Sequence, residues 1–538
     1  MSVEINKNEL SDEATPSDNN VLDNNMQDKN VPEGNESNIL DDTLSEAAAL
    51  DNKVFDDSKL VKLNGIKSQG LNPYPYKFEK SEDIKDILTK FEDFEKNEGL
   101  SVRTAGRLYN IRKHGKMIFA DLGDQAGRIQ ILLRKGNLPD EEFETFKNLV
   151  DSGDIIGIQG TLFKTKRGED SISVSEFSLL SKSLCSLPEK YHGLKDVETR
   201  YRKRYLDLIF NVEKRDIFVM RSKLISQIRR FLAERDFLEF ETPVLQTVYG
   251  GANARPFTTF HNFLEQKLFL RIAPELYLKR LVVGGYEKVF EICKNFRNED
   301  IDTTHNPEFT MIEVYEAYSD YNDMMDLTEN LVSELVLNLT GSYEIKMGEK
   351  TINLCRPWKR ISMEDALKEY AGLDVFAHSL EELKKIAIEN RIEDYEKAKS
   401  HGEFLALLFE GLVEDKLVNP TFIYDFPVEN SPLAKNHREK PGFVERFELF
   451  LNGWELANGY SELNDPLEQE RRFEEQDKKR KLGDLEAQTV DYDFINALGY
   501  GLPPTGGMGL GIDRLTMILA GLESIKEVIL FPQMKRED

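Results

Sequence analysis

Two arginines far apart in the chain, Arg297 and Arg514, each lie in a stretch suited to binding phosphate. Arg297 belongs to the Phe-Arg-Asn-Glu run at 296–299, and Arg514 follows the glycine-rich run at 507–511. Guanidinium groups are planar, permanently charged forks that suit bidentate phosphate contacts. Glycine lets backbone come close to a ligand where a Cβ would clash. The two stretches therefore predict a binding site for a nucleoside triphosphate that lacks a P-loop. In it, Arg297 would neutralise the α-phosphate while charge shifts during displacement at that phosphorus.

The segment 309–315 is predicted to be a strand that presents functional side chains. Alternate side chains of a strand share a face, so Phe309, Met311, Glu313 and Tyr315 should line up together. A core strand whose polar residues happen to reach solvent is the alternative. That alternative must also explain why the strand directly follows a His-Asn-Pro turn and the Arg-Asn-Glu loop. Phe309 would then offer a platform for a purine.

A third stretch carries carboxylates on both sides of an Asn-Gly pair, the strongest short hairpin signal. If Asn452 and Gly453 form the turn, Phe450 pairs with Glu455, and Glu448 lies on that same face. Two converging carboxylates suit magnesium, which also binds substrate phosphates. A solvated hairpin with two surface glutamates remains the alternative.

Asn458 and Glu462 continue the second strand of this hairpin. Simple alternation would place both on the face opposite Glu448 and Glu455. Glycine often marks a bend or bulge in a strand. We therefore expect one at Gly459 that brings Asn458 and Glu462 round to the carboxylate face.

Composition bounds the kind of protein that carries these residues. The chain has 538 residues, enough for two or three domains, and a formal net charge of −26. Residues 1–60 hold fifteen acidic residues against four lysines, and 1–55 is predicted to be an acidic disordered tail. The acidity weakens non-specific attraction to RNA, but specific binding needs only a local basic surface.

The three cysteines show no paired spacing, so neither a disulfide framework nor structural zinc is expected. The N-terminal sequence lacks the basic and apolar regions of a signal peptide. No apolar run reaches the roughly eighteen residues of a membrane-spanning helix. These features predict a cytoplasmic protein without a membrane partner.

The elements fall into two groups along the chain. A helical segment is expected at 56–99. Five short strands interrupted by a helix at about 140–151 predict a small closed OB-type barrel over 100–183; the strands are 102–107, 117–122, 127–133, 154–160 and 171–174. A charged linker over 184–205 leads to the second group. Over 206–538 strands and helices alternate, starting with a helix at about 213–235. Residues 341–420 are predicted to be a helical insertion with a helix start at Ser379.

Together these stretches resemble motifs 2 and 3 and the active-site strands of class II aminoacyl-tRNA synthetases, and most closely the bacterial-type lysyl-tRNA synthetases. The resemblance runs from about residue 60 to the end. Residues 239–243 look like the motif 1 strand of the dimer interface. The stretches 250–257, 271–276 and 458–462 separate the lysine enzymes from their aspartate and asparagine relatives.

The resemblance implies a fold and an activity. The fold is α+β, with a class II antiparallel sheet flanked by helices and preceded by an all-β OB-fold barrel. The activity is ATP-dependent ligation of L-lysine to tRNA(Lys) through a lysyl-adenylate, with Mg²⁺ as cofactor. A homodimer formed through motif 1 is also implied, with no DNA partner.

The resemblance also implies a role for individual residues. Those implied to bind ATP are Arg297, Glu299, His305, Phe309, Glu448 and Arg514, with Arg297 and Arg514 catalytic and Arg514 on the γ-phosphate. Those implied to bind lysine are Gly251 and Glu275 (α-ammonium), Asn458 and Arg297 (carboxylate), and Glu313, Tyr315 and Glu462 (side-chain ammonium). Those implied to bind metal are Glu448 and Glu455, and those implied to read the anticodon are Phe119, Gln130 and Glu169.

Other interpretations stay open. Phe119 alone would more often be a barrel core aromatic. Asp300 stands where the family pattern leads us to expect glycine. A lysine ligase acting on a protein would share the catalytic domain but lack the anticodon barrel. A catalytically inactive RNA-binding paralogue should have lost some of its phosphate and metal residues, and none is missing.

Overall fold

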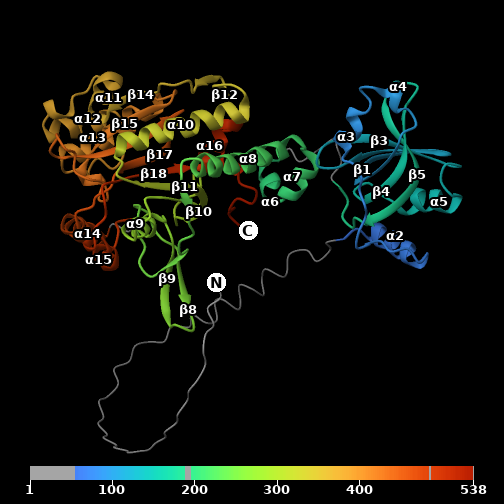
Figure 1. Ribbon diagram of the computed structural model, residues 1–538, viewed down its shortest axis with the longest axis horizontal. Coiled ribbons are helices and arrows are strands. Elements are labelled where there is room, and N and C mark those ends of the chain that lie inside the picture. The colour runs from blue at the N-terminus through green and yellow to red at the C-terminus, as the bar shows by residue number, and fades with distance from the viewer. Residues whose placement is uncertain (1–54, 188–195, 484–485, 537–538) are drawn as a thin grey trace, which may run out of the picture. The chain divides into compact units, whose positions relative to one another are not determined.

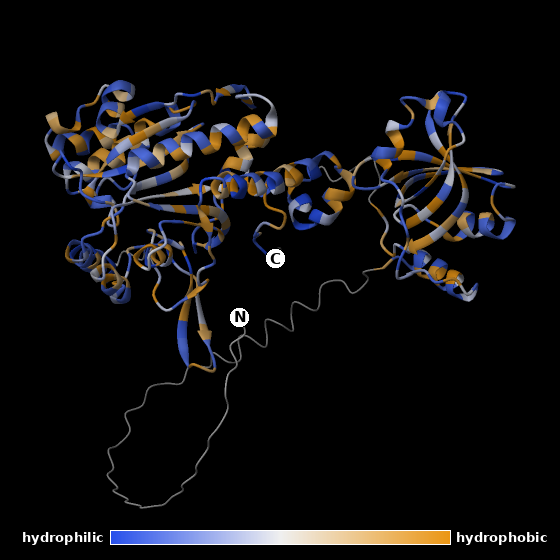
Figure 2. Cartoon of the chain, in the orientation of Figure 1, coloured by the Kyte–Doolittle hydropathy of each residue, from blue (hydrophilic) through white to orange (hydrophobic). Residues whose placement is uncertain are grey.

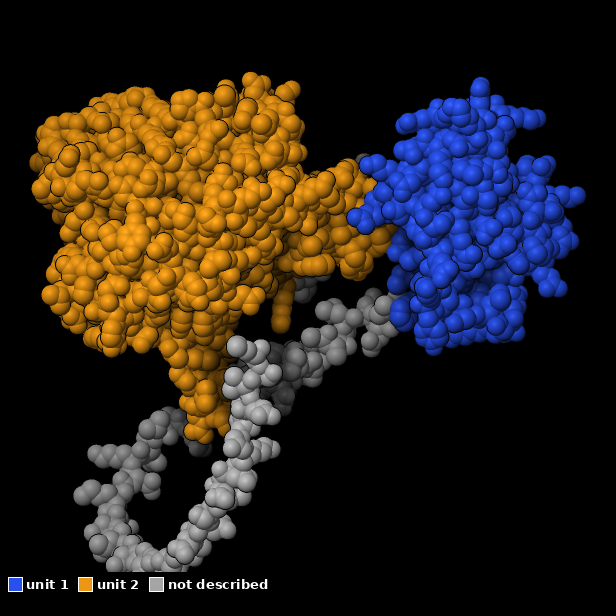
Figure 3. Space-filling model, viewed as in Figure 1, with its two compact units in different colours: residues 1–189 blue, residues 190–538 orange. Residues whose placement is uncertain are grey.

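The computed structural model describes residues 55–187, 196–483 and 486–536. The chain divides into two compact units, 1–189 and 190–538 (Figure 3). All but the last residue of the predicted acidic tail, and residues 188–195 of the predicted linker, lie outside the described residues. No helix in the described ranges is long and apolar enough to cross a membrane.

Unit 1 contains the predicted barrel. Three helices come first: α2 (Asp57–Ser68), α3 (Ile84–Thr89) and α4 (Phe94–Asn97). Five strands then close in the order β1-β2-β3-β5-β4, with α5 (Asp140–Leu149) after the third; they are β1 (Ser101–His114), β2 (Met117–Gly123), β3 (Arg128–Arg134), β4 (Ile155–Lys164) and β5 (Asp170–Ser181). The five-stranded barrel with a helix after the third strand is therefore confirmed.

Strand β2 shows which residues fill the barrel. Ile118, Ala120 and Leu122 are fully buried in its core. Hydrophobic and hydrophilic residues alternate along the barrel strands (Figure 2). Phe119 has the opposite parity and is only partly buried. The alternative that Phe119 is a barrel core aromatic is therefore wrong, because successive side chains point to opposite faces.

Unit 2 is built on an eight-stranded sheet in the order β14-β15-β16-β17-β18-β11-β10-β6. The strands in that order are β14 (Lys359–Ser362), β15 (Thr421–Pro427), β16 (Phe443–Leu451), β17 (Trp454–Ser461), β18 (Thr505–Gly511), β11 (Glu308–Ala317), β10 (Lys288–Phe296) and β6 (Leu238–Glu239). The six central strands are antiparallel, as predicted, whereas the two edge strands pair in parallel.

Helices cover both faces of this sheet. On one face α8 (Glu213–Ala233), α10 (Tyr321–Thr340) and α16 (Ile512–Ala520) contribute to the main core, where Ile312 and Val314 of β11 are fully buried. On the other, α9 (Glu275–Val283), α14 (Pro466–Lys481) and α15 (Tyr492–Gly499) pack with Tyr315 and Ala317. The parity of β11 therefore separates a structural face from the face that carries the predicted site.

Residues 341–420 are not purely helical, which corrects the prediction for this insertion. The helices are α11 (Met363–Ala371), η1 (Val375–Ala377), α12 (Leu380–Glu389), α13 (His401–Leu412) and η2 (Glu414–Lys416). Before them, β12 (Glu344–Met347) pairs with β13 (Lys350–Asn353), and β14 joins the sheet. These strands are four residues long, too short for a clear alternation signal. The predicted helix start at Ser379 is confirmed by a capping box with Glu382.

The remaining elements surround the sheet. Two short helices open the unit, α6 (Val197–Arg202) and α7 (Arg204–Phe210). A separate three-stranded sheet consists of β7 (Leu245–Gln246), β8 (Thr258–His261) and β9 (Gln266–Leu270), and its β8–β9 hairpin projects from unit 2 (Figure 1). Two 3₁₀ turns are η3 (Val428–Asn430) and η4 (Ile525–Glu527).

Candidate active site

A cavity of about 410 Å³ in unit 2 collects the residues predicted for catalysis and substrate binding. Of those predictions Glu448 alone is absent from its lining. The predicted residues that line it are Gly251, Glu275, Arg297, Glu299, His305, Phe309, Glu313, Tyr315, Glu455, Asn458, Glu462 and Arg514. Asp300 lines it as well. Stretches as far apart in sequence as Gly251 and Arg514 thus meet in one cavity.

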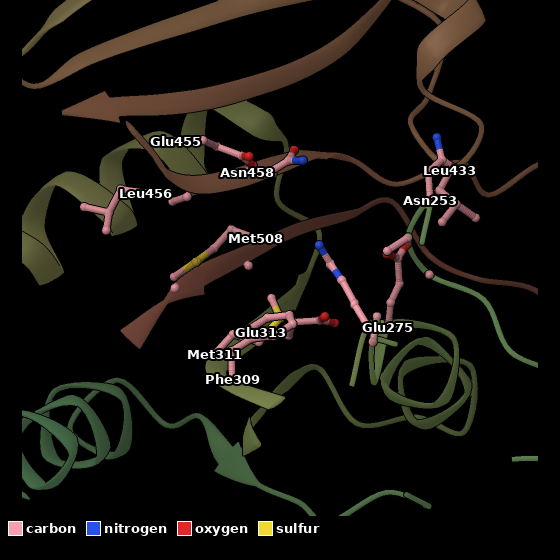
Figure 4. A pocket seen from close by; sticks show the side chains of 18 of the residues that line it. Asn253, Glu275, Phe309, Met311, Glu313, Leu433, Glu455, Leu456, Asn458 and Met508 are labelled. Carbon is pink, nitrogen blue, oxygen red and sulfur yellow. The ribbon is translucent and has the colours of Figure 1, made fainter. Parts of the chain in front are cut away.

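Strand β11 forms one wall. Its alternate residues Phe309, Met311, Glu313 and Tyr315 all line the cavity, as predicted. Figure 4 shows Glu313 on this wall, with Glu455 and Asn458 reaching in from another strand, β17. The alternative of an ordinary core strand is wrong, because the polar residues of β11 face a cavity rather than bulk solvent.

The glycines of β18 make room for their neighbours. Gly507, Gly509 and Gly511 all line the cavity. A Cβ on Gly507 would lie 2.0 Å from a carboxylate oxygen of Glu462 and 2.6 Å from the ring of Tyr315. A β-carbon would need to displace both side chains. The sequence analysis assigned these glycines to the close approach of a ligand. Gly507 is also required because the side chains of Glu462 and Tyr315 occupy the space that its β-carbon would fill.

One end of the cavity, here called the acidic end, consists of Glu275, Glu313 and Glu462, whose residues are only 4 %, 4 % and 1 % exposed. The hydroxyl of Tyr315 donates to Oε2 of Glu313 at 2.9 Å. The hydroxyl of Tyr460 donates to Oε1 of Glu275 at 2.6 Å. Burial, and secondly the charge of Glu275, raises the pKa of Glu313 to about 8.

Lys279 supplies a cation to this end from behind. Its Nζ lies 2.5 Å from Oε1 of Glu275 and also pairs with Glu462. Burial raises the pKa of Glu462 well above its ordinary value, while the charge of Lys279 opposes that shift. Neither Glu462 oxygen accepts a hydrogen bond of good geometry from any described residue. A buried carboxylate in that state suits a ligand that brings an additional donor.

A second part of the lining, here called the basic end, consists of Arg297, His305 and Arg514. The Arg297 guanidinium lies 5.0 Å from the ring centroid of Phe309, and its buried Nε has no hydrogen-bond partner among the described residues. Burial lowers the pKa of Arg297. A desolvated cation of this kind is suited to an anionic ligand.

His305 and Arg514 are joined at the mouth of this end. Nη2 of Arg514 lies 3.2 Å from Nε2 of His305, whose Nδ1 lies 2.8 Å from a carboxylate oxygen of Asp302. The arrangement is satisfied if Nδ1 donates to Asp302 and Nε2 accepts from Arg514. Nη1 of Arg514 donates to the carbonyl oxygen of Glu455 at 2.5 Å.

The hairpin of β16 and β17 pairs Phe450 with Glu455, as predicted. The predicted bulge at Gly459 is wrong, because Gly459 pairs regularly with Phe447. A Cβ at Gly459 would lie 2.5 Å from the Gly507 carbonyl oxygen, so close strand packing explains this glycine. The irregularity lies between Leu449 and Phe450, opposite residues 455–457.

This shift of one residue has the effect that the Gly459 bulge was expected to have. It places Glu448 directly opposite Asn458. Asn458, Tyr460 and Glu462 then share the face of Glu448 by alternation. The sequence predicted the need for an irregularity but not its position.

Glu448 lies beside the cavity and is held by another residue. Nη2 of Arg446 lies 2.5 Å from Oε1 of Glu448, and Nε of Arg446 donates to Oδ1 of Asn458 at 3.2 Å. Burial, and secondly the charge of Glu455, raises the pKa of Glu448 to about 7. Two neighbouring carboxylates that disfavour each other's charge are a donor pair that Mg²⁺ fits when phosphate oxygens complete its shell. Within the described ranges, no group of three or more metal-ligating side chains is arranged to hold a metal by itself.

Four cavity-side residues were not predicted: Lys279, Arg446, Tyr460 and Gln488. The sequence could have indicated two of them. Lys279 follows Glu275 at the i,i+4 spacing of helical ion pairs, and Tyr460 alternates with Asn458 and Glu462 along the strand. No sequence pattern pointed to Gln488. Its Oε1 accepts from the backbone N–H of Gly251 at 3.3 Å, where Gly251 has φ of +90°.

The predicted anticodon residues lie in unit 1, on the barrel. Phe119 is on β2, Gln130 on β3 and Glu169 in the exposed turn before β5. The Gln130 amide donates to Oγ of Ser171 at 2.9 Å and accepts from Arg112 at 2.8 Å. Gln130 is buried, and both ends of its amide are engaged within the barrel, which fixes the orientation of the amide.

Comparison with known protein families identifies the class of protein. Residues 196–535 match the family of tRNA synthetases class II (D, K and N), and residues 102–180 match the OB-fold nucleic acid binding domain of anticodon-binding type. The first match covers more than half of the chain. The chain therefore belongs to the class II tRNA synthetases of the aspartate, lysine and asparagine group.

Individual relatives narrow the activity. The chain is 91% identical over 484 residues to "Lysine--tRNA ligase 2" of Methanosarcina mazei, covering 90% of this chain and 95% of that protein. It is 60% identical over 487 residues to "Lysine--tRNA ligase" of Methanoculleus marisnigri, covering 90% and 96%. It is 50% identical over 490 residues to the ligase of that name from Nostoc sp., covering 89% and 87%. Within the family, this enzyme joins lysine to tRNA.

Proposed function

We propose that the cavity carries out lysine activation, with lysine at the acidic end and ATP at the basic end. The observation that supports this best is the grouping of side chains in one cavity: three buried carboxyl groups lie together, and two guanidinium groups and an imidazole line another part of it. A substrate with two ammonium groups and one with a triphosphate are matched by such a site. The carboxylate of lysine would meet the triphosphate between the two ends.

The proposed reaction has two steps. An oxygen of the lysine carboxylate attacks the α-phosphorus of ATP, the bond from that phosphorus to the bridging oxygen breaks, and pyrophosphate leaves. The terminal adenosine hydroxyl of tRNA(Lys) then attacks the lysyl carbonyl, and AMP leaves. Little acid–base chemistry is needed, so positioning and charge neutralisation provide most of the rate enhancement.

The proposed lysine contacts follow from the acidic end. Gly251 and Glu275 receive the α-ammonium, and Asn458 with Arg297 receives the carboxylate. Glu313, Tyr315 and Glu462 receive the side-chain ammonium; the unsatisfied oxygens of Glu462 support that role. A site built to hydrogen-bond a substrate group penalises analogues that leave its polar atoms unpaired.

The proposed nucleotide contacts follow from the basic end. Arg297 neutralises the α-phosphate, supported by its unpartnered buried Nε. Phe309 offers its ring to the adenine, with Glu299 and His305 at the adenine and outer phosphates. Arg514 clamps the γ-phosphate. Glu448 and Glu455 would hold Mg²⁺, which when bound would supply positive charge to the phosphates of ATP.

The proposed tRNA contact is the barrel surface. Phe119 faces outward on β2, so it is free to stack with an unpaired anticodon base, and Gln130 and Glu169 can bond base edges. We further propose a cytoplasmic homodimer formed through the stretch that resembles motif 1. The edge strand β6 and its flank support the dimer, since Leu238 and Leu245 are exposed there. A monomeric mass in sedimentation at micromolar concentration would contradict it.

Lysine-dependent ATP–pyrophosphate exchange tests the first step, and lysylation of a tRNA(Lys) transcript tests the second. Exchange with another amino acid but not with lysine would reject the substrate assignment. The OB-type anticodon domain argues against a ligase acting on a protein. The presence of Arg297, Glu455 and Arg514 in one cavity argues against an inactive paralogue.

A further inference from the structure

Lys279 links two carboxylates of the acidic end without lining the cavity itself. It lies on α9 with 0 % exposure, between the rings of Tyr460, whose centroid is 5.4 Å from Nζ, and Phe494, at 5.9 Å. Its Nζ pairs with Glu275 on the same helix and with Glu462, which follows β17. One ammonium therefore joins segments about 185 residues apart.

The energetics of this arrangement favour a role beyond packing. Burying an ammonium is costly unless it is well paired. Without Lys279, the neighbouring buried carboxyl groups of Glu275 and Glu462 would lose the cation that joins them and fixes their separation. The pKa of Lys279 itself is raised because the two carboxylates outweigh the effect of burial.

We propose that Lys279 is a positioning residue for lysine recognition, acting through Glu275 and Glu462. Its ammonium pairs with both carboxyl groups and fixes their places, so that each meets one ammonium group of the substrate. The inference rests on the proposed function, because that function assigns Glu275 and Glu462 to lysine. Lys279 does not touch the substrate.

Two substitutions separate charge from shape. Lys279→Met keeps the length of the side chain and removes its charge, whereas Lys279→Arg keeps the charge and changes the shape. We expect Lys279→Met to raise the KM for lysine in pyrophosphate exchange by about tenfold or more, as for the loss of a charged contact. The KM for ATP should stay within about twofold, and Lys279→Arg should do less harm to lysine binding. Greater harm from arginine than from methionine would mean that packing, not charge, matters, and would overturn the proposal.

A matched control is the next residue on the helix. Arg280 pairs with Asp491 at 2.9 Å, outside the cavity. Arg280→Met also removes one cation from α9, so any general effect on the helix should appear in it. We expect its KM for lysine to equal that of the wild type. An equal rise in both variants would overturn the proposal.

A double-mutant cycle with Glu462→Gln tests whether Lys279 acts on lysine binding through Glu462. If Lys279 acts through Glu462, adding Lys279→Met to Glu462→Gln should raise the KM for lysine little further, whereas independent roles give additive changes. The double variant also removes both members of a buried ion pair, which is tolerated better than removing one. It therefore keeps the test informative if Lys279→Met alone fails to fold.

The two proposals can fail separately. If Glu462→Gln leaves the KM for lysine unchanged, the proposed lysine pocket is wrong and this inference fails with it. If Glu462→Gln raises that KM and Lys279→Met does not, the pocket stands and the inference alone fails.

Discussion

At the acidic end of the cavity, the carboxyl groups of Glu275 and Glu313 are hydrogen-bonded to other side chains of the protein. At the basic end, Arg514 contacts a backbone carbonyl and a histidine, and the buried Nε of Arg297 has no hydrogen-bond partner among the described residues. Glu275 bonds Tyr460 and Lys279, and Glu313 bonds Tyr315. Neither oxygen of Glu462 accepts a hydrogen bond of good geometry from any described residue. The carboxyl groups of Glu275 and Glu313 are thus held before substrate arrives, whereas Glu462 and Arg297 are left to bond a ligand.

This difference suggests how each substrate is bound. In the proposed function, a preorganised carboxylate cluster selects lysine by geometry, because its groups are already held in place. Cations without carboxylate partners keep their full charge for the triphosphate and for the charge that shifts in the transition state. Substitutions at the two ends should therefore have different effects on activity and on stability.

The largest effect is expected for Arg297→Met at the basic end. Loss of a positioned cation on the α-phosphate should lower kcat/KM in pyrophosphate exchange by about 10²–10³-fold. The melting temperature should not fall, because a buried, poorly paired guanidinium is costly to the folded state. A drop in melting temperature with nearly normal exchange would show that Arg297 is structural.

Glu462→Gln probes the acidic end. It should weaken lysine binding by about 1.5–3 kcal/mol, the range for a hydrogen bond to a charged group. ATP binding should hardly change, since Glu462 is assigned no nucleotide contact. The control is Glu349→Gln, an exposed residue in the turn between β12 and β13. A raised ATP requirement with an intact lysine requirement would place the side-chain pocket elsewhere.

Phe119→Ala contrasts the barrel with the cavity. Loss of one base-stacking ring should cost about 1–3 kcal/mol in tRNA binding. Lysylation of the transcript should weaken accordingly, while exchange without tRNA should be unchanged. Val61→Ala, an exposed position on α2 of the same unit, serves as the control. An equal loss in both assays would mean that Phe119 supports the fold of the barrel.

The smallest effect is expected for Tyr315→Phe. Its hydroxyl donates to Glu313 inside the acidic end, so its removal should cost lysine affinity about 0.5–1.5 kcal/mol, the net value of one hydrogen bond. The loss should be in the same direction as that of Glu462→Gln, with ATP affinity unchanged. A loss larger than that of Glu462→Gln would show that Tyr315, rather than Glu462, dominates recognition of the side-chain ammonium.

Local patterns predicted much of this site correctly. The alternation of Phe309, Met311, Glu313 and Tyr315 and the turn at Asn452 follow from strand periodicity and turn chemistry, which depend on adjacent residues alone. The residue pattern and the family resemblance together predicted the barrel. Predictions failed where a short element took its structure from distant packing, as β12–β14 did within the insertion.

The position of the irregularity in β17 shows the same limit. Gly459 carried the local signal for a bulge, but in the folded chain its missing side chain lets β17 lie against Gly507 of β18. The register shift occurs near Leu456 instead, where Glu455 must reach the cavity beside Asn458. A glycine can serve a bulge or a close approach, and sequence spacing does not distinguish the two.

By itself, the sequence determined which chemical groups are present and which of them share a strand face, because period-two alternation is a property of the backbone. Only the tertiary structure decided which groups pair across the chain. Lys279 lies between Glu275 and Glu462, and Arg446 lies between Glu448 and Asn458. Those contacts join elements that are distant in sequence. A buried charge is stable only when it is paired, and the tertiary structure decides which segment lies close enough to pair with it.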